Sequence, residues 1–457
     1  MKEARRARRA QLVMLCSLGC VLGACGGGDA AKTSGAGGSA GNGGSSAGPS
    51  AAAGQAGSSV GPDVKAGASA AAGSSGSSGR DAGSSARAAA GAASGSNAGS
   101  SANGTLINPA PGGKLFVGAN FWNVEWEGAG DYFASGVNWA TTQNPWNPTF
   151  LADLAPYHVL RFMDWNLTNE ANNAQANWDT RPKQTDAQKE PIAFEWQIDL
   201  CNRAKQDYWV TIPHQANAEY FAKLAQLIHD KLDPGLRVYV EWSNEVWNGT
   251  FPQRAYAQTQ GKNLGLAGTD PAASFLVYQS VRAFEAFEAV FGKGSPRLVK
   301  VIAGQAASSG PCQAHVKALS DAKINPNHTQ PTVYAVAPYI KGNSVSDLSS
   351  KGIPEVTTWI QDNYKCASGA GLPLIAYEGG QDSYAAGVSA CTQLQHDAGL
   401  HDVYTKFLDA MVSAKLSGPL MQYTHSGQCW GLKEKTSDTL DKSPKYKGVV
   451  DWLAAHP

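Results

Sequence analysis

The feature that most limits the fold of this 457-residue chain is a regular alternation between short β-forming runs and longer helical segments. Eight apolar runs recur, at residues 114–120, 157–165, 207–214, 237–244, 298–305, 332–340, 372–380 and 418–427. The segments between them are mostly typical of helices, and those at 218–232, 274–292 and 401–416 are amphipathic. A strand followed by a crossover helix places the next strand parallel to the first. Eight such units predict an α/β fold of the (β/α)₈ barrel type, and no Gly-rich phosphate loop follows the first run to favour an open sheet.

The first 25 residues have the layout of an export signal rather than of a folded element. An Arg-rich start is followed by an apolar run from Leu12 to Leu22, and the segment ends in Leu22-Gly23-Ala24-Cys25. This ending resembles a bacterial lipobox, in which the cysteine is diacylated and becomes the new N-terminus. We therefore expect lipidation at Cys25 and anchoring to the bacterial outer membrane or cell surface, with simple secretion as the alternative. The apolar run is too short for a membrane-spanning helix, so the lipid is the only membrane attachment that we expect.

Residues 26–104 consist almost entirely of Gly, Ala and Ser. A segment of this composition cannot bury enough apolar surface to offset the entropy of ordering it, which predicts a disordered linker. Residues 44–48 match the G-x-S-x-G pattern of serine hydrolases, but no strand precedes them, and we attribute the match to composition. The folded domain is expected at residues 105–457, which is long enough for one large barrel.

Charge and histidine usage exclude several classes of function. Lys and Arg total 37, as do Asp and Glu, so the formal net charge is +0 and nothing favours nucleic acid as a partner. The nine histidines are scattered without metal-ligand spacing. We expect no metal, no cofactor and a monomeric protein.

Five cysteines follow the signal segment: Cys201, Cys312, Cys366, Cys391 and Cys429. Export permits disulfides, and an odd number leaves at least one thiol. Cys201 lies in a helix-like run and is expected to be a buried free thiol. The other four can form two bridges, of which we favour Cys391 with Cys429.

Polar side chains end nearly every β-forming run, at the positions where a barrel gathers its chemistry. These residues are Asn120, Arg161, Asp164, His214, Asn244, Glu245, Tyr339, Glu378, Gln381 and His425. Helix caps and loop polarity explain some of them but not Glu245 together with Glu378. The fourth and seventh strands lie across the barrel mouth from each other, so these two carboxylates can face each other over a bound molecule. Opposed carboxylates with separated pKa values are the minimum equipment for glycoside hydrolysis.

The motif VYVEWSNEVWN at residues 238–248 resembles the fourth-strand motif of the clan A glycoside hydrolases, and family 5 glycanases are the nearest comparison. These are retaining enzymes with a TIM barrel, in which an Asn-Glu pair closes the fourth strand. The resemblance implies that Glu245 is the general acid/base and that Glu378, at the end of the seventh strand, is the nucleophile. It also implies that Asn244 binds the sugar 2-hydroxyl and that Arg161 lies beside the nucleophile.

Two departures from the clan pattern are present. Val246 replaces the proline usual after Asn-Glu, and VAPYI at residues 336–340 replaces the usual His-x-Tyr of the sixth strand. Glu241 resembles a glutamate often found four residues before the acid/base. We expect Glu241 to pair with a cation such as Arg161 inside the barrel.

Tryptophan usage also favours a sugar ligand, because flat apolar rings with a polar N–H suit pyranose faces. Nine of the 13 tryptophans follow strand ends: Trp122, Trp126, Trp139, Trp146, Trp165, Trp178, Trp242, Trp247 and Trp430. Some of these are expected in the core, and the loop at 122–146 is the best candidate for a subsite wall. The candidate substrate-binding residues are Asn244, Arg161, His214, Tyr339, Trp122, Trp126, Trp247, Trp430 and His425.

Together these patterns predict a retaining glycoside hydrolase, an endo-β-glycanase that cleaves β-linked polysaccharide or oligosaccharide by double displacement with two glutamates. The alternative is a cell-surface barrel that binds carbohydrate without cleaving it. A pure binder needs neither Glu245 nor Glu378 in this arrangement. A metal-dependent hydrolase, the third possibility, lacks a His/Asp ligand set in the sequence.

Overall fold

The computed structural model describes residues 105–122, 132–170, 176–266, 268 and 270–457. The expected signal segment with Cys25, the expected linker and Trp126 lie outside these residues.

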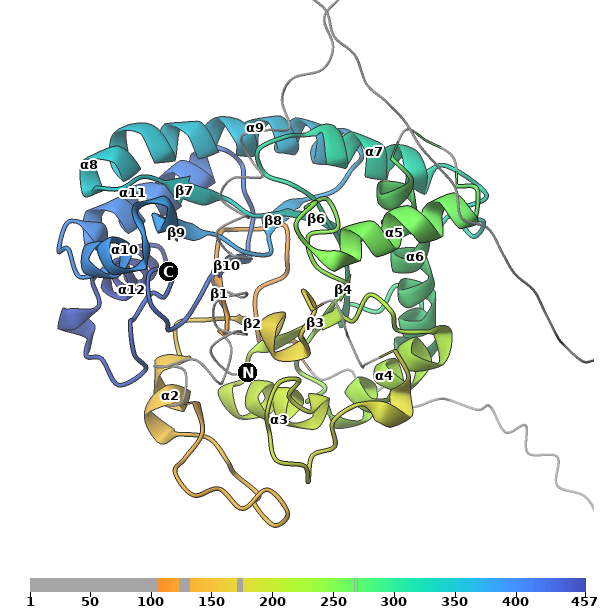
Figure 1. Ribbon diagram of the computed structural model, residues 1–457, viewed down its shortest axis with the longest axis horizontal. Helices are drawn as coiled ribbons and strands as arrows, with labels where there is room; N and C mark the ends of the chain where they lie inside the picture. The colour runs from red at the N-terminus through yellow and green to blue at the C-terminus, as the bar shows by residue number, and fades with distance from the viewer. Residues whose placement is uncertain (1–104, 123–131, 171–175, 267, 269) are drawn as a thin grey trace, which may run out of the picture. The chain divides into compact units, whose positions relative to one another are not determined.

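Eight parallel strands close into a barrel in the order β1-β10-β8-β6-β5-β4-β3-β2, and Figure 1 shows them at the centre of a ring of helices. The strands are β1 (Val117–Asn120), β2 (Val159–Arg161), β3 (Asp207–Ile212), β4 (Val238–Trp242), β5 (Leu298–Ala303), β6 (Val333–Val336), β8 (Leu374–Ala376) and β10 (Leu420–Gln422). Each of the eight predicted runs contains one of them. The domain is therefore a (β/α)₈, or TIM, barrel, as predicted.

Helices follow the barrel strands and cover the outside of the barrel. They are α2 (Pro148–Asp153), α3 (Phe194–Ala204), α4 (Ala218–Lys231), α5 (Pro252–Asn263), α6 (Pro271–Phe291), α7 (Gly310–Leu319), α8 (Val345–Asp347), α9 (Ile353–Gly369), α10 (Val388–Gln395), α11 (Leu400–Ser413) and α12 (Pro444–Ala455). Local sequence sets several starts: the Asn217 side chain caps α4, and Asp270 caps α6 just before Pro271. Among the described residues, no helix combines the length and the apolar character needed to cross a membrane.

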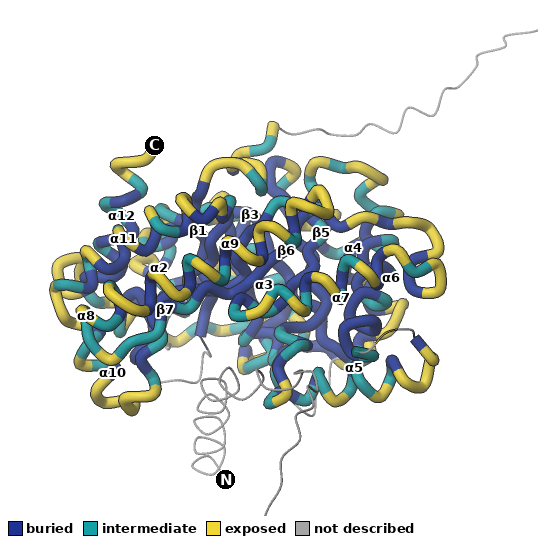
Figure 2. Tube along the Cα trace, turned by 90° about the horizontal axis from the view of Figure 1, so that it is seen from above, coloured by how far each residue is buried: buried dark blue, intermediate teal, exposed yellow. Residues whose placement is uncertain are grey.

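Successive side chains along each strand alternate between the barrel interior and the layer under the helices. In β4, Val238 and Val240 pack outward in the core shared with the helices, whereas Tyr239 belongs to the cluster that fills the barrel. Arg161 and Glu241 occupy inward positions of β2 and β4 near the ends of these strands. Figure 2 shows the strands buried beneath the helices, so the barrel is a packed core.

The sixth and seventh predicted runs extend beyond their barrel strands. After each strand the chain makes a second short strand, β7 (Tyr339–Lys341) or β9 (Gly380–Asp382), and these two pair in parallel outside the barrel. Pro338 lacks a backbone N–H, which prevents β6 from continuing as one ladder. Gly380 has a φ of 134°, which permits the turn between β8 and β9. Tyr339 therefore begins β7 rather than ending β6.

The disulfide prediction is confirmed. Cys391 bonds to Cys429, and Cys312 bonds to Cys366. Cys201 is a buried free thiol in α3, as expected.

Candidate functional site

A cavity of about 230 Å³ lies at the carboxyl ends of the barrel strands. Predicted site residues that line it are Glu245, Glu378, Asn244, Tyr339, Trp122, Trp247 and Trp430. Arg161 is fully buried and is not part of the lining, but it contacts several of these residues. The barrel thus brings together most of the residues that the sequence singled out.

Glu378 follows β8, and both of its carboxylate oxygens accept hydrogen bonds. Arg161 Nη1 donates to Oε1 over 2.7 Å, and Tyr339 Oη donates to Oε2 over 2.8 Å. The residue is only 4% exposed. These donors come from β2 and β7, so the barrel and its extra sheet together fix one orientation of the carboxylate.

Arg161 is the centre of a buried polar network under the cavity. It donates to Glu241 Oε2 from Nε over 3.0 Å, which confirms the predicted pairing. It also donates to Asn120 Oδ1 over 3.0 Å and to Asn244 Oδ1 over 2.8 Å. A buried guanidinium with a full set of acceptors holds its neighbours in fixed positions. Glu241 is therefore a supporting residue and does not reach the cavity lining.

Glu245 is placed by an unusual backbone after β4. Ser243 has a φ of 64° and Glu245 a φ of 43°, both in the left-handed region that residues with side chains seldom adopt. Backbone strain of this kind persists where the surrounding structure holds it, and it is enriched at functional sites. The Glu245 carboxyl accepts from Asn248 Nδ2 over 3.0 Å and from Tyr377 Oη over 3.1 Å.

The two glutamates differ in electrostatic environment. Burial, and next the negative charge of Glu378, raise the pKa of Glu245 to about 8. The hydrogen bonds from Asn248 and Tyr377 act in the opposite direction and are outweighed. Glu245 therefore carries a proton at neutral pH, whereas Glu378 has the Arg161 cation against it. One carboxyl that can donate a proton beside one paired with a cation is the division of roles needed for acid-assisted displacement.

Asn244 is held by both ends of its amide. Its Oδ1 accepts from Arg161, and its Nδ2 donates to Asn169 Oδ1 over 3.1 Å. Gln253 donates to the same Asn169 oxygen over 2.6 Å. The amide orientation of Asn244 at the cavity wall is therefore fixed. Asn169 and Gln253 are distant in sequence, and no motif marked them.

The tryptophans divide between cavity and core. Trp122 and Trp430 line the cavity and stack, with ring centroids 5.3 Å apart and an interplanar angle of 23°. Trp247 also lines the cavity, and its Nε1 donates to Tyr377 Oη over 3.3 Å. Trp146 and Trp165 are instead buried in the main core. Of the loop predicted as a subsite wall, residues 122–146, Trp122 thus lines the cavity, whereas Trp146 packs in the core.

Neither predicted histidine lines the cavity. The His425 ring packs among Phe150, Tyr157 and Tyr446 under the helices, and burial lowers its pKa to about 3. The His214 ring packs edge-on against Tyr256 of α5. Both side chains thus face the helical layer.

Three tyrosines at the site were not among the residues predicted from the sequence. Tyr377, just before Glu378, points into the barrel and bonds to Glu245. Tyr423 donates to Asp164 Oδ2 over 3.0 Å, and both residues line the cavity. Tyr384 stacks on Trp430 with centroids 4.7 Å apart. The alternation in β8 could have indicated an inward Tyr377, but the other two depend on how loops meet.

Across the described residue ranges, no group of three or more His, Cys, Asp or Glu side chains is arranged to hold a metal ion.

No protein-family model and no curated protein matches the sequence. Solved structures with a similar fold include a 4-O-α-L-rhamnosyl-β-D-glucuronidase from Fusarium oxysporum 12S. It is 15% identical, with a TM-score of 0.45 over 77% of this chain and 73% of that one. A glucosidase from Croceicoccus marinus is 10% identical, with a TM-score of 0.46 over 76% and 69% of the two chains. A modular endo-β-1,4-mannanase from Cellulomonas fimi is 10% identical, with a TM-score of 0.42 over 75% and 70%. The likeness extends to the fold alone.

Proposed function

We propose that the protein is a retaining glycoside hydrolase in which Glu378 is the nucleophile and Glu245 the general acid/base. The observation that carries this proposal is that the Glu245 and Glu378 side chains line the same cavity. The pKa of Glu245 is raised by burial and by the charge of Glu378, while Arg161 and Tyr339 fix the oxygens of Glu378. The strand-end positions of both glutamates in a TIM barrel support the same assignment.

In the first step, Glu378 attacks the anomeric carbon and forms a glycosyl ester as the bond to the leaving oxygen breaks. Glu245 gives its proton to that oxygen, and the leaving sugar departs as an alcohol. In the second step, the Glu245 carboxylate takes a proton from water, and the water oxygen attacks the anomeric carbon. Glu378 is released as a carboxylate, and two inversions leave the configuration unchanged.

The substrate we propose is an uncharged β-linked polysaccharide or oligosaccharide cut within the chain. Aromatic side chains on the lining suit the apolar faces of pyranose rings. Six acidic side chains line the cavity, namely Asp164, Glu170, Glu190, Glu245, Glu378 and Asp382. Lys341 is the one Lys or Arg among the lining residues of the described chain, so an anionic sugar would be repelled.

The test is turnover of dinitrophenyl β-glycosides and of soluble glucan, mannan, xylan and β-1,3-glucan, each with a chelator present. Turnover of any of these substrates would exclude a barrel that only binds carbohydrate. Because the chelator is present, it would also exclude a metal-dependent hydrolase. NMR of the first-formed sugar should show retained configuration. An inverted product would remove the nucleophile role from Glu378.

Substitutions separate the two roles. Glu378→Ala should abolish turnover of every substrate. Glu245→Ala should still form the intermediate from a dinitrophenyl glycoside, because dinitrophenolate leaves without a proton, and should break it down slowly. Added azide should rescue this variant and yield a β-glycosyl azide, since a small anion fits where the carboxyl was. Rescue of Glu378→Ala but not Glu245→Ala would reverse the roles.

A further inference from the structure

One wall of the cavity is a continuous series of aromatic rings that begins at the proposed nucleophile. Tyr339, which bonds to Glu378, packs edge-on against Tyr423 with centroids 6.3 Å apart. Tyr423 lies 5.5 Å from Trp122, and Trp122 stacks on Trp430. Trp430 stacks in turn on Tyr384. All five of these residues line the cavity.

The outer part of this series stands on two loops that have little regular structure. Tyr384 lies in the connection between β9 and α10, and Trp430 lies in the connection between β10 and α12. Loops of this kind sample many arrangements unless they are tied down. A stacked pair of rings contributed by two separate loops therefore needs a link between them.

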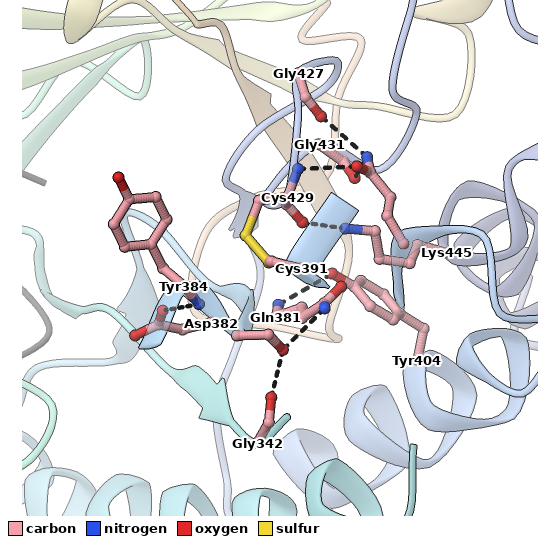
Figure 3. The surroundings of a disulfide bond; sticks show 12 residues. Gly342, Gln381, Asp382, Tyr384, Cys391, Tyr404, Gly427, Cys429, Gly431 and Lys445 are labelled. Atoms are coloured by element: carbon pink, nitrogen blue, oxygen red, sulfur yellow. Dashed lines mark hydrogen bonds between the residues drawn. A yellow bond between two sulfur atoms is a disulfide. The ribbon is translucent and has the colours of Figure 1, made fainter. Parts of the chain in front are cut away.

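The Cys391–Cys429 disulfide is that link, as Figure 3 shows. Cys391 is in α10, a few residues after Tyr384, and Cys429 directly precedes Trp430. Both cysteines are fully buried and form one apolar cluster with Trp122 and Trp430.

Hydrogen bonds reinforce the same loop around Cys429. The backbone N–H of Cys429 donates to Gln395 Oε1 over 2.9 Å, and Gln395 Nε2 donates to the carbonyls of Gly427 and Gly431 over 3.0 and 2.7 Å. The buried Lys445 amine donates to the Cys429 carbonyl over 2.8 Å. Cys429 itself has a φ of 69°, a conformation that persists only where the surroundings impose it. The loop that carries Trp430 is thus held by covalent and polar contacts together.

The proposed reaction indicates which end of the bound sugar chain the aromatic wall contacts. Glu245 has to reach the leaving oxygen, so the leaving sugar lies toward Glu245 and its neighbours Trp247 and Asn248. The sugar attacked by Glu378 remains on the enzyme, and the aromatic series starts at the tyrosine that binds Glu378. Rings held in place before binding lose little entropy when a sugar packs on them.

We propose that the Cys391–Cys429 disulfide is a positioning element for a sugar-binding wall of Trp122, Trp430 and Tyr384, which holds the retained end of a polysaccharide. The wall's place on the retained side rests on the proposed hydrolase function, whereas its binding of sugar does not.

The experiment compares two double variants in which one disulfide each is removed. Cys391→Ala/Cys429→Ala removes the bridge at the wall. Cys312→Ala/Cys366→Ala removes the bridge between α7 and α9, whose cysteines do not line the cavity. The two bridges span 38 and 54 residues, so a loop-entropy effect on stability is of similar size. The second variant therefore controls for general loosening.

Binding is measured by the retardation of each protein in native gels that contain glucan, mannan, xylan or β-1,3-glucan, in a Glu245→Gln background that blocks turnover. Loss of the wall bridge should weaken binding of the retarding polysaccharide about tenfold, by the loss of preorganised contacts. Loss of the control bridge should leave binding unchanged. Trp430→Ala with both bridges intact should match the first result, and Trp178→Ala, outside the cavity lining, should match the second.

Equal binding by the two double variants, or tight binding by Trp430→Ala, would overturn the proposal. So would the absence of retardation by all four polysaccharides. In the turnover assay without the Glu245→Gln change, loss of the wall bridge should raise KM for polysaccharide and leave kcat nearly unchanged. Retardation without any turnover in that assay would remove the hydrolase function and leave the wall in place, so the two failures are distinguishable.

Discussion

Arg161 Nη1 and Glu378 Oε1 lie 2.7 Å apart in a buried contact that joins the end of β2 to the segment just after β8. The same guanidinium also binds Glu241, so one cation serves two buried carboxylates. Removing one partner of a buried ion pair destabilises the folded state strongly, because the remaining charge is left unpaired in the protein interior. This contact links the stability of the barrel to the geometry of the proposed nucleophile.

Arg161→Met should lower the free energy of unfolding by about 3–5 kcal/mol, since it leaves two buried carboxylates without their cation. Turnover should be lost as well. The measurement is unfolding in urea at pH 7. Arg203→Met is a suitable control, because Arg203 pairs with Asp199 at the partly exposed surface and its loss should change stability by no more than about 1 kcal/mol. Equal losses for the two variants would contradict the central role of Arg161.

The pKa of Glu245 predicts the alkaline limit of activity. Glu245 has to be protonated to assist the leaving group, and its pKa is about 8, so kcat/KM should fall as the pH rises through about 8.

Tyr377→Phe removes a hydrogen bond that lowers the pKa of Glu245, and the fall in kcat/KM should therefore move to higher pH. Tyr364→Phe, at the exposed surface of α9, should leave the pH profile unchanged. A shift to lower pH in the Tyr377 variant would show that this hydroxyl acts differently on Glu245.

Stability should also depend on the charge of Glu245. Because its folded-state pKa is raised, the carboxyl gives its full stability below the unfolded pKa and loses it as pH rises toward about 8. Glu245→Gln keeps the neutral shape at every pH. The variant should match the unaltered protein in Tm at pH 4, below the unfolded pKa, and exceed it at pH 9 by at least about 2–4 °C. Glu355→Gln, at an exposed position of α9, should show no such dependence on pH. An equal Tm of Glu245→Gln and the unaltered protein at pH 9 would contradict a buried charge at this position.

Lipidation at Cys25 remains a proposal from the sequence, and it predicts where the protein resides. The full-length protein should partition into the detergent phase after phase separation, because two or three acyl chains anchor a protein firmly. Cys25→Ser should move it to the aqueous phase. Full-length protein that is soluble in the culture medium would favour simple secretion instead.

The sequence by itself determined the order of elements and the identity of the two central glutamates. Alternation between strand and helix periods is a local property, and in eight repeats it leads to a closed parallel barrel whose strand ends meet. For that reason the sequence alone places Glu245 and Glu378 at one cavity and pairs Glu241 with Arg161. The Cys391–Cys429 disulfide could likewise be predicted from the sequence.

Tertiary structure alone decided which other side chains reach the cavity. His214 and His425 stand at strand ends, yet both rings face the helical layer, because the turn after each strand sets the direction of the side chain. Tyr384 and Trp430 come from loops that follow different strands, and they stack where these loops pack together beside the Cys391–Cys429 disulfide. The left-handed backbone at Ser243 and Glu245 is also imposed by its surroundings. Local patterns encode the elements, but contacts between residues far apart in sequence depend on barrel closure and loop packing, which no short stretch of sequence contains.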